Sequence, residues 1–302
     1  ALALALTAAC GSGADGTSSG GGTQAVAPAG AFPVTVTGTN GEVIVEQRPE
    51  AIVSLSPTAT EMLFAIGAGD QVTAVDDQST YPTEAPRTDL SGYTPNVEAI
   101  AGHQPDLVVL ANDTNGIVAA LERLDITVLQ LTAAANVPES LTQTSVLGAA
   151  TGHVAEAAEV VTSVQKRLAD AVASMPAEAK GRKVYHELDP TFYSVTSDTF
   201  IGDVYRMLGL KNIADDAKDT SGGYPKLSSE FVVQAQPDLI VLADSICCQQ
   251  DAAALAKRPG FKAVPAVKSG KVVGVGDDVA SRWGPRVADF AESVAAAFQA
   301  GS

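Results

Sequence analysis

The chain contains only three histidines and three cysteines, the residue types that most often hold transition-metal ions or act as nucleophiles and bases. Its histidines are His103, His153 and His186, and none of them lies in an HExxH arrangement. We find no GxSxG nucleophile elbow and no phosphate-binding GxxxxGK[ST] loop. A metal site made of protein side chains usually needs several imidazoles or thiolates, so direct binding of a bare transition-metal ion is only an alternative. A hydrolase that uses Glu187 and Asp189 is a second alternative, although carboxylates at strand ends are common.

Two cysteines, Cys247 and Cys248, are adjacent and follow an apolar run at 238–244. Their spacing excludes the CxxC arrangement of zinc sites. Neighbouring thiols in an oxidising compartment tend to oxidise, so we expect a vicinal disulfide after a strand, near the rim of a cleft. The alternative is a buried pair of reduced thiols without a function.

The chain is strongly acidic, with 35 Asp and Glu against 19 Lys and Arg and a formal net charge of −16. A nucleic-acid groove needs clustered basic residues to neutralise phosphates, so we expect no nucleic-acid partner. Hydrophobic residues make up 46% and the mean hydropathy is +0.14, which is enough for a packed core. The length of 302 residues suggests two domains.

Residues 1–31 differ from the rest of the chain. Residues 1–9, ALALALTAA, are an apolar run too short to span a bilayer, and we interpret them as a signal-peptide remnant. Cys10 opens a Gly/Ser/Thr-rich tether over 10–31, a pattern that resembles a bacterial lipobox except that Thr7 stands where Leu is commonest. We expect Cys10 to anchor the protein through lipid to the extracytoplasmic face of the cytoplasmic membrane. The alternative is an ordinary cleaved signal with an incidental cysteine.

Short apolar runs alternate with amphipathic stretches along the rest of the chain, which is typical of βαβ units and parallel sheets. The alternating segment 32–46, centred on Asn40-Gly41, predicts a β-hairpin. Further strands are expected at 51–57, 71–76, 106–112, 126–131, 183–188, 238–244 and 271–276. Helices are expected between them, with a terminal helix at about 285–298.

One long helix is expected over 151–176. Its apolar residues recur at spacings of three and four, and Pro176 ends the run. At 1.5 Å per residue, about 24 residues span roughly 36 Å, which is enough to connect two domains.

A repeat relates the two halves of the chain. Residues 104–111 read QPDLVVLA, and residues 236–243 read QPDLIVLA, 132 positions later. We therefore predict an α/β fold of two Rossmann-like lobes with parallel sheets, over 32–150 and 177–302. The long helix joins the lobes, and a ligand cleft lies between them.

Several segments resemble the substrate-binding proteins of metal-chelate ABC importers, which take up ferric siderophores, haem and cobalamin. The resemblance covers essentially the whole chain after about Phe32 and is carried by SLSPTATEMLFAIGAG, NVEAIAGHQPDLVVL, TFIGDVYRMLGLKNIA, SSEFVVQAQPDLIVL and SRWGPRV. It implies two lobes bridged by a rigid helix, modest closure on a ligand, an importer permease as partner, and no enzymatic activity. On this resemblance the metal chelate is cargo, and we expect no resident cofactor.

Ligand contacts are expected from loops at the carboxyl ends of the parallel strands. Tyr93 and Tyr224 occupy matching places in the two halves, where aromatic rings can stack on a bulky chelate; the alternative is packing within each lobe. Asp278 and Arg282 resemble polar contacts of the family, although they could instead bond only each other. The expected ligand-binding residues are Tyr93, Tyr224, Asp278, Arg282, Trp283, Gln78 and Glu187.

The charge of the expected cleft bears on the identity of the chelate. Anionic ferric siderophores are usually held by several cationic side chains, and the sequence offers few: Arg282 is the expected cation, and Arg286 is expected to face the helix. This favours a ligand of low net charge, although Gln78 stands where a cobalamin binder would have an aromatic residue. Corrinoid and ferric siderophore rank nearly equal, with haem below them because no axial His or Tyr can be assigned.

Glu98 and Glu230 lie in matching places of the two lobes, each two residues after a good N-cap, Asn96 or Ser228. In the family that the chain resembles, one surface Glu per lobe docks onto Arg residues of the two-fold symmetric permease. The resemblance therefore implies that Glu98 and Glu230 dock a monomeric binding protein onto its permease. The alternative is structural, because a helix dipole favours a carboxylate in the first turn.

Overall fold

The computed structural model of the protein describes residues 31–299, so the predicted signal remnant and the lipidated Cys10 lie outside the described residues. The N-terminal lobe is built on a five-stranded parallel sheet of order β5-β4-β3-β6-β7. Its strands are β3 (Ile52–Leu55), β4 (Val72–Asp76), β5 (Arg87–Leu90), β6 (Leu107–Leu110) and β7 (Thr127–Gln130). The helices around it are α1 (Pro57–Ala65), α2 (Val97–Ala101) and α3 (Ile117–Glu122).

The predicted hairpin is present as β1 (Val34–Gly38) and β2 (Gly41–Val45), which pair antiparallel. Gly41 sits at the turn with φ of 104°, a conformation that only glycine adopts without strain. The Asn40 side chain accepts a hydrogen bond from the Gln130 N–H at 3.0 Å, which ties the hairpin to the end of β7.

The C-terminal lobe holds a four-stranded parallel sheet of order β11-β10-β8-β9. Its strands are β8 (Lys183–Glu187), β9 (Lys211–Asn212), β10 (Leu239–Leu242) and β11 (Val272–Gly274). Its helices are α6 (Phe200–Met207), α7 (Ser229–Ala235), α8 (Ala252–Lys257), α9 (Pro265–Lys268), α10 (Asp277–Ser281) and α11 (Val287–Gln299). The predicted α/β class with two parallel sheets is confirmed.

The sequence repeat has a counterpart in the strand pairing. Strand β3 pairs in parallel with β6, with Leu55 opposite Leu110, and β8 pairs with β10, with Glu187 opposite Leu242. Because Leu110 and Leu242 occupy the same place in the repeat, Glu187 is the counterpart of Leu55. Every residue of β3, β6 and β10 is buried, which explains their continuous apolar character.

The connection between the lobes contains two helices, α4 (Val137–Thr151) and α5 (Val154–Ser174), and Gly152 separates them with φ of 79°. The long helix predicted from residue 151 thus begins at Val154, and Thr151 belongs to α4. No helix was predicted over 137–150. Helix α4 buries polar side chains as well as apolar ones against neighbouring elements. Its buried face therefore does not appear in the sequence as a regular spacing of apolar residues.

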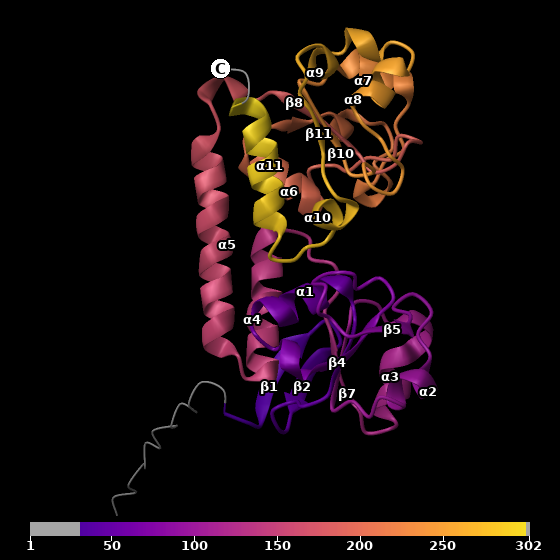
Figure 1. The fold of residues 1–302 in the computed structure, drawn as a ribbon, viewed down its shortest axis with the longest axis vertical. Helices are drawn as coiled ribbons and strands as arrows, with labels where there is room; N and C mark the ends of the chain where they lie inside the picture. Colours follow the sequence, from indigo (N-terminus) through magenta and orange to yellow (C-terminus); the bar gives the residue numbers. More distant parts are fainter. Residues whose placement is uncertain (1–30, 300–302) are drawn as a thin grey trace, which may run out of the picture.

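Helix α5 runs along one side of both lobes, next to α4 at one end and α11 at the other (Figure 1). Its residue Ala157 packs into the core of the N-terminal lobe, whereas Val164, Leu168 and Ala171 pack into the core of the C-terminal lobe. A single continuous helix buried in both cores holds the lobes in a defined relation.

Candidate functional site

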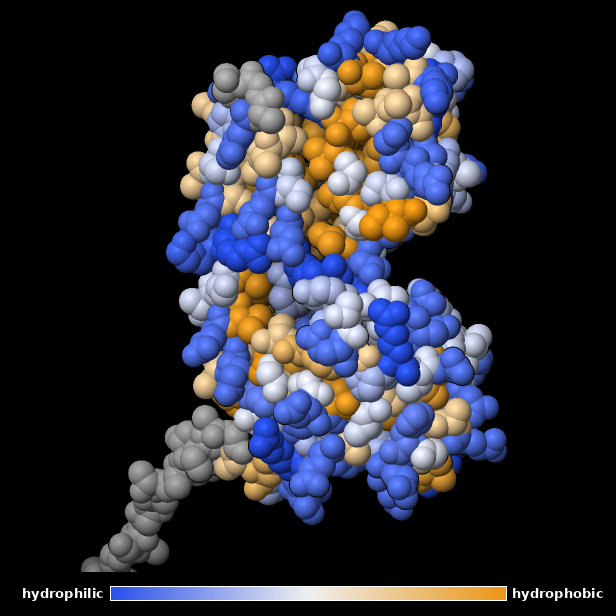
Figure 2. Space-filling model, in the orientation of Figure 1, coloured by the Kyte–Doolittle hydropathy of each residue, from blue (hydrophilic) through white to orange (hydrophobic). Residues whose placement is uncertain are grey.

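A cavity of about 270 Å³ lies between the two lobes, and the surface is hollowed there on the side away from α5 (Figure 2). The N-terminal lobe supplies residues that follow the carboxyl ends of its strands, and the C-terminal lobe supplies α10 and the turn after it. The predicted residues that line this cavity are Gln78, Tyr93, Asp278, Arg282 and Trp283. The structure thus brings residues from distant parts of the sequence to one site.

The floor of the cavity includes Asp76, whose side chain is buried and accepts a hydrogen bond from the Ser79 hydroxyl at 2.6 Å. Burial raises the pKa of the Asp76 carboxyl above its usual value. Gly92 passes so close that a Cβ there would lie 2.6 Å from Asp76 Oδ2 and 2.7 Å from the Leu55 carbonyl oxygen. Glycine at this position lets the chain reach the cavity and present Tyr93.

Arg282 belongs to the C-terminal lobe, but its guanidinium binds the N-terminal lobe. It donates to Glu61 Oε1 at 2.8 Å, to the Gln78 carbonyl oxygen at 2.9 Å and to Thr80 Oγ1 at 3.3 Å. It also pairs with Asp278 Oδ1 at 2.7 Å. The Asp278–Arg282 bond is present, but the alternative that these residues bond only each other is wrong, because both also make contacts that cross the cleft.

Arg286 makes a second connection between the lobes. Its Nε donates to Glu61 Oε2 at 2.8 Å, and its guanidinium carbon lies 4.2 Å from the centre of the Tyr81 ring. Thr80 adds a third connection, because its hydroxyl donates to Asp278 Oδ2 at 2.9 Å. We call Glu61, Arg282 and Arg286 the interlobe triad.

Two aromatic residues at the cavity differ in how far their side chains are exposed and held by hydrogen bonds. The Tyr93 side chain is exposed, with a residue accessibility of 72%, so its ring is available to a ligand. Trp283 is half-buried, and its indole N–H donates to Gln143 Oε1 of α4 at 3.0 Å. The Trp283 ring is therefore held by the helical connection at the edge of the site.

Glu187 does not line the cavity. It is buried, and Arg258 donates to its two oxygens at 2.6 Å each, while the Tyr185 hydroxyl donates to Oε2 at 3.0 Å. Asp244 lies beside it, also fully buried, and burial with the Glu187 charge raises the Asp244 pKa to about 7. An interaction between the Asp244 and Glu187 side chains contributes to this rise.

Tyr224 does not line this cavity either. It lies on a stretch that pairs with the segment after β8, where Ser194 N donates to the Pro225 carbonyl and Thr196 N to the Gly223 carbonyl. Its residue accessibility is 46%, and partial burial raises the pKa of its hydroxyl. The matching sequence positions of Tyr93 and Tyr224 do not place both side chains in one cavity.

Cys247 and Cys248 are exposed free thiols in the turn that follows β10, with their sulfur atoms 2.7 Å apart. The predicted strand-end position is correct, and the alternative of a buried pair is wrong. The pKa of the Cys247 thiol is raised to about 12. The hydrogen bond with Cys248 is the largest cause, and burial and Asp277 contribute in the same direction. Asp277 is the neighbour of the cavity residue Asp278, so the pair lies near the cavity's rim. The vicinal disulfide stays a prediction.

Glu98 and Glu230 occupy the first turns of α2 and α7, and both are exposed. The predicted N-caps are present, since the Ala99 N–H donates to Asn96 Oδ1 at 2.8 Å and the Phe231 N–H donates to Ser228 Oγ at 3.1 Å. Helices α2 and α7 lie on the sides of the two lobes away from α5 (Figure 1). This geometry leaves both carboxylates accessible to a partner.

The histidines lie apart from the cavity. His186 is fully buried, with Nδ1 at 2.6 Å from the Tyr205 hydroxyl, whereas His103 is exposed. Within residues 31–299 no group of three or more His, Cys, Asp or Glu side chains is arranged to hold a metal ion. No helix in that same range has the length and apolar character needed to cross a membrane.

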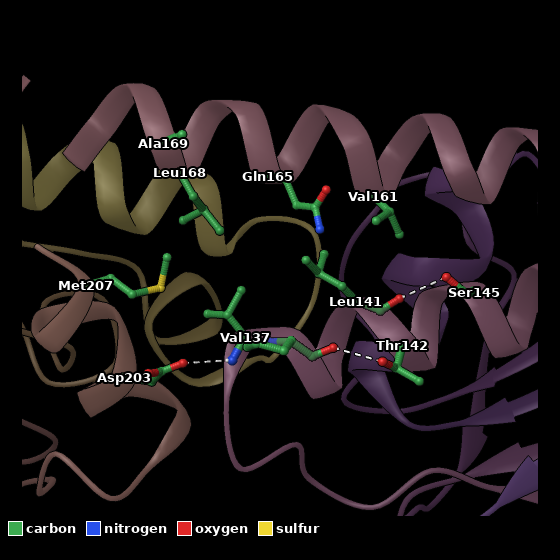
Figure 3. A pocket seen from close by; sticks show the side chains of 11 residues that line it. Val137, Leu141, Thr142, Ser145, Val161, Gln165, Leu168, Ala169, Asp203 and Met207 are labelled. Atoms are coloured by element: carbon green, nitrogen blue, oxygen red, sulfur yellow. Dashed lines mark hydrogen bonds between the residues drawn. The ribbon is translucent and has the colours of Figure 1, made fainter. Parts of the chain in front are cut away.

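A larger cavity of about 570 Å³ lies between α4, α5 and α6, where Leu141, Val161 and Leu168 project into the space (Figure 3). The Val137 N–H donates to Asp203 Oδ2 at 3.0 Å beside it. This cavity contains none of the predicted ligand-binding residues, so size alone does not identify the functional site.

Sequence reasoning missed Glu61, Asp76 and Asn112. Asn112 and Asp76 line the cavity, and the repeat could have indicated Asn112 because it directly follows the repeated strand, as Asp244 does in the second half. Glu61 is the one charged residue in the apolar segment TATEMLFAIGAG. A charged residue in such a segment is buried only when it is paired, so the sequence could have indicated that Glu61 has a partner of opposite charge.

Comparisons with known proteins agree on the family. The chain is 32% identical over 305 residues to an uncharacterized ABC transporter substrate-binding lipoprotein, YvrC, of Bacillus subtilis, covering 97% of this chain and 93% of the relative. It is 33% identical over 276 residues to a cobalamin-binding protein of Halobacterium salinarum, covering 88% and 74%. These relatives are named as binding proteins and not as enzymes.

Solved structures show the same fold. The vitamin B12-binding protein BtuF of Vibrio cholerae superposes with a TM-score of 0.68 at 24% identity, over 84% of this chain and 98% of that chain. The haem-binding protein RhuT of Roseiflexus sp. RS-1 superposes with a TM-score of 0.73 at 22% identity, over 84% and 100%. The family model described as periplasmic binding protein matches residues 52–279, and the chain belongs to this family.

Proposed function

We propose that this protein binds a metal chelate of low net charge between its lobes, with a corrinoid as the best fit, and delivers it to an ABC importer permease. Its family and relatives make it a substrate-binding protein for ABC import, of the type that includes B12-, siderophore- and haem-binding proteins, and not an enzyme. The chelate is cargo in this proposal, and no resident cofactor takes part.

The charge of the cavity carries the proposal. Arg282 is the one cationic residue among the described residues that line the cavity, and Glu61 and Asp278 already neutralise it. A strongly anionic siderophore would find no unpaired cation there. The amides of Gln78 and Asn112 and the exposed Tyr93 ring suit the amide groups and flat macrocycle of a corrinoid.

A binding panel tests the choice of chelate. Quenching of Trp283 fluorescence would be measured with cyanocobalamin, haemin, a neutral ferric hydroxamate and a ferric tris-catecholate. We expect cyanocobalamin to bind most tightly and Tyr93→Ala to weaken it by about tenfold, roughly 1.4 kcal/mol. Tyr193→Ala is the control, because Tyr193 is an exposed tyrosine that lies outside this cavity. Tighter binding of the tris-catecholate, or equal effects of both variants, would contradict the proposal.

Delivery requires a permease and a membrane position. Exposed Glu98 and Glu230, one on each lobe, suit docking onto paired Arg residues of a two-fold symmetric permease through charge-assisted bonds. Lipid on Cys10 would hold the protein at the extracytoplasmic membrane surface, in line with the lipoprotein name of the Bacillus subtilis relative. Incorporation of labelled palmitate that disappears in Cys10→Ala tests the anchor.

A further inference from the structure

The geometry points to Glu61 as the residue that sets the charge selectivity of the cleft, by holding Arg282 and Arg286 so that neither guanidinium is free to bind an anionic ligand. This inference rests on the proposed function and deepens it. Glu61 is a positioning residue, because it does not line the ligand cavity and acts through the two arginines.

The carboxylate of Glu61 is placed to engage both arginines at once. It projects from α1, has a side-chain exposure of 2%, and uses Oε1 for Arg282 at 2.8 Å and Oε2 for Arg286 Nε at 2.8 Å. The arginine side chains are 10% and 19% exposed. Charge-assisted bonds at such low exposure are strong and weakly screened by salt.

The charges of the interlobe triad and Asp278 balance. Arg282 and Arg286 carry two positive charges, and Glu61 and Asp278 carry two negative charges, with Asp278 paired to Arg282 at 2.7 Å. Neutralising Glu61 leaves Arg286 without a direct ion pair among the described residues, with the Tyr81 ring and the nearby charge of Asp278 as its neighbours. It leaves Arg282 with Asp278 and two neutral acceptors. These side chains would then carry one net positive charge, with Arg282 lining the cavity and Arg286 lining a second pocket beside Tyr81.

A purely structural role is the competing explanation. The triad joins the lobes, so in either case its disruption lowers the free energy of unfolding. The two explanations differ in ligand preference: only a role in selectivity predicts that an anionic chelate gains affinity when Glu61 loses its charge. The ratio of affinities for an anionic and a neutral chelate is therefore the informative measurement.

The experiment compares Glu61→Gln with Glu84→Gln. Glu84 is exposed, lines the pocket that also contains Glu61 and Arg286, and forms no ion pair with a described residue. The control therefore makes the same local change in net charge without breaking an ion pair of an arginine. Dissociation constants would be measured for cyanocobalamin, which is neutral, and for a trianionic ferric tris-catecholate. We expect Glu61→Gln to bind the tris-catecholate at least tenfold more tightly than the wild type, with cyanocobalamin within about threefold. We expect Glu84→Gln to change neither.

A double variant tests whether the gain comes from the released positive charge. Glu61→Gln with Arg286→Gln removes the orphaned Arg286 and leaves Arg282 paired with Asp278, so the paired charges balance again and the affinity for the tris-catecholate is expected to return to within about threefold of the wild type. A folded Glu61→Gln variant that gains no more than Glu84→Gln, or a folded double variant that keeps the full gain, overturns the inference. Wild-type protein that binds the tris-catecholate as tightly as cyanocobalamin overturns it as well. Loss of cyanocobalamin binding in the wild type would instead refute the proposed function, and this inference with it.

Discussion

Protonation of buried His186 is expected to make the protein unstable in acid. The imidazole is fully buried in the C-terminal lobe, between Tyr205 and Phe290, and burial lowers its pKa from 6.5 to about 3. The unfolded chain therefore binds a proton at His186 below pH 6.5, whereas the native state does so only near pH 3. The resulting stability is fully present above pH 6.5 and is lost as the pH falls toward 3.

The size of this effect follows from the separation of the two pKa values. Each pH unit below 6.5 costs about 1.4 kcal/mol of unfolding free energy, so at pH 4.5 the loss is roughly 3 kcal/mol. Asp244 acts in the opposite direction, because its raised pKa of about 7 makes the native state bind the extra proton as the pH falls. Comparison of variants with and without His186 cancels the Asp244 contribution.

Guanidinium denaturation at pH 7.5 and pH 4.5 measures the effect. Wild-type protein is expected to lose about 3 kcal/mol more between the two pH values than His186→Asn, which cannot titrate. His103→Asn is the matched control, because His103 is exposed, and it should behave as the wild type does. Parallel losses in wild type and His186→Asn, within about 1 kcal/mol, would refute the assignment of a neutral buried imidazole.

Two further predictions concern surface residues. Under air, Cys247 and Cys248 are expected to form a disulfide with oxygen as the oxidant, faster at high pH because the thiolate reacts, and reduction should then add two hydrogens to the intact mass. Free thiols throughout would exclude it. Replacing both Glu98 and Glu230 by Ala should abolish uptake through the permease, yet leave ligand affinity unchanged and lower the unfolding free energy by no more than about 2 kcal/mol. Glu156→Ala, a first-turn glutamate of α5, is the control; lost ligand binding in the double variant would indicate a structural role.

Local signals in the sequence predicted most elements of the fold. Continuous apolar runs correspond to the buried strands, and the repeated QPDL segment corresponds to β6 and β10 in equivalent sheet positions. The caps Asn96 and Ser228 bond within their own first turns, so adjacent residues suffice to predict them. Helix α4 escaped prediction because burial on several sides removes the apolar periodicity by which a helix is recognised.

The sequence by itself determined the α/β class, the repeated lobes, the bridging helix and the approximate location of the cleft. Each of these follows from patterns within short segments: the spacing of apolar residues, the repeated strand and the positions at which strands end. The tertiary structure alone decided the electrostatics of the site. Arg282 could be named from the sequence as a cleft cation, but its partner Glu61 lies 221 positions away. Whether a charge is free or neutralised depends on contacts within a few ångströms, and folding creates those contacts between segments that no local pattern connects.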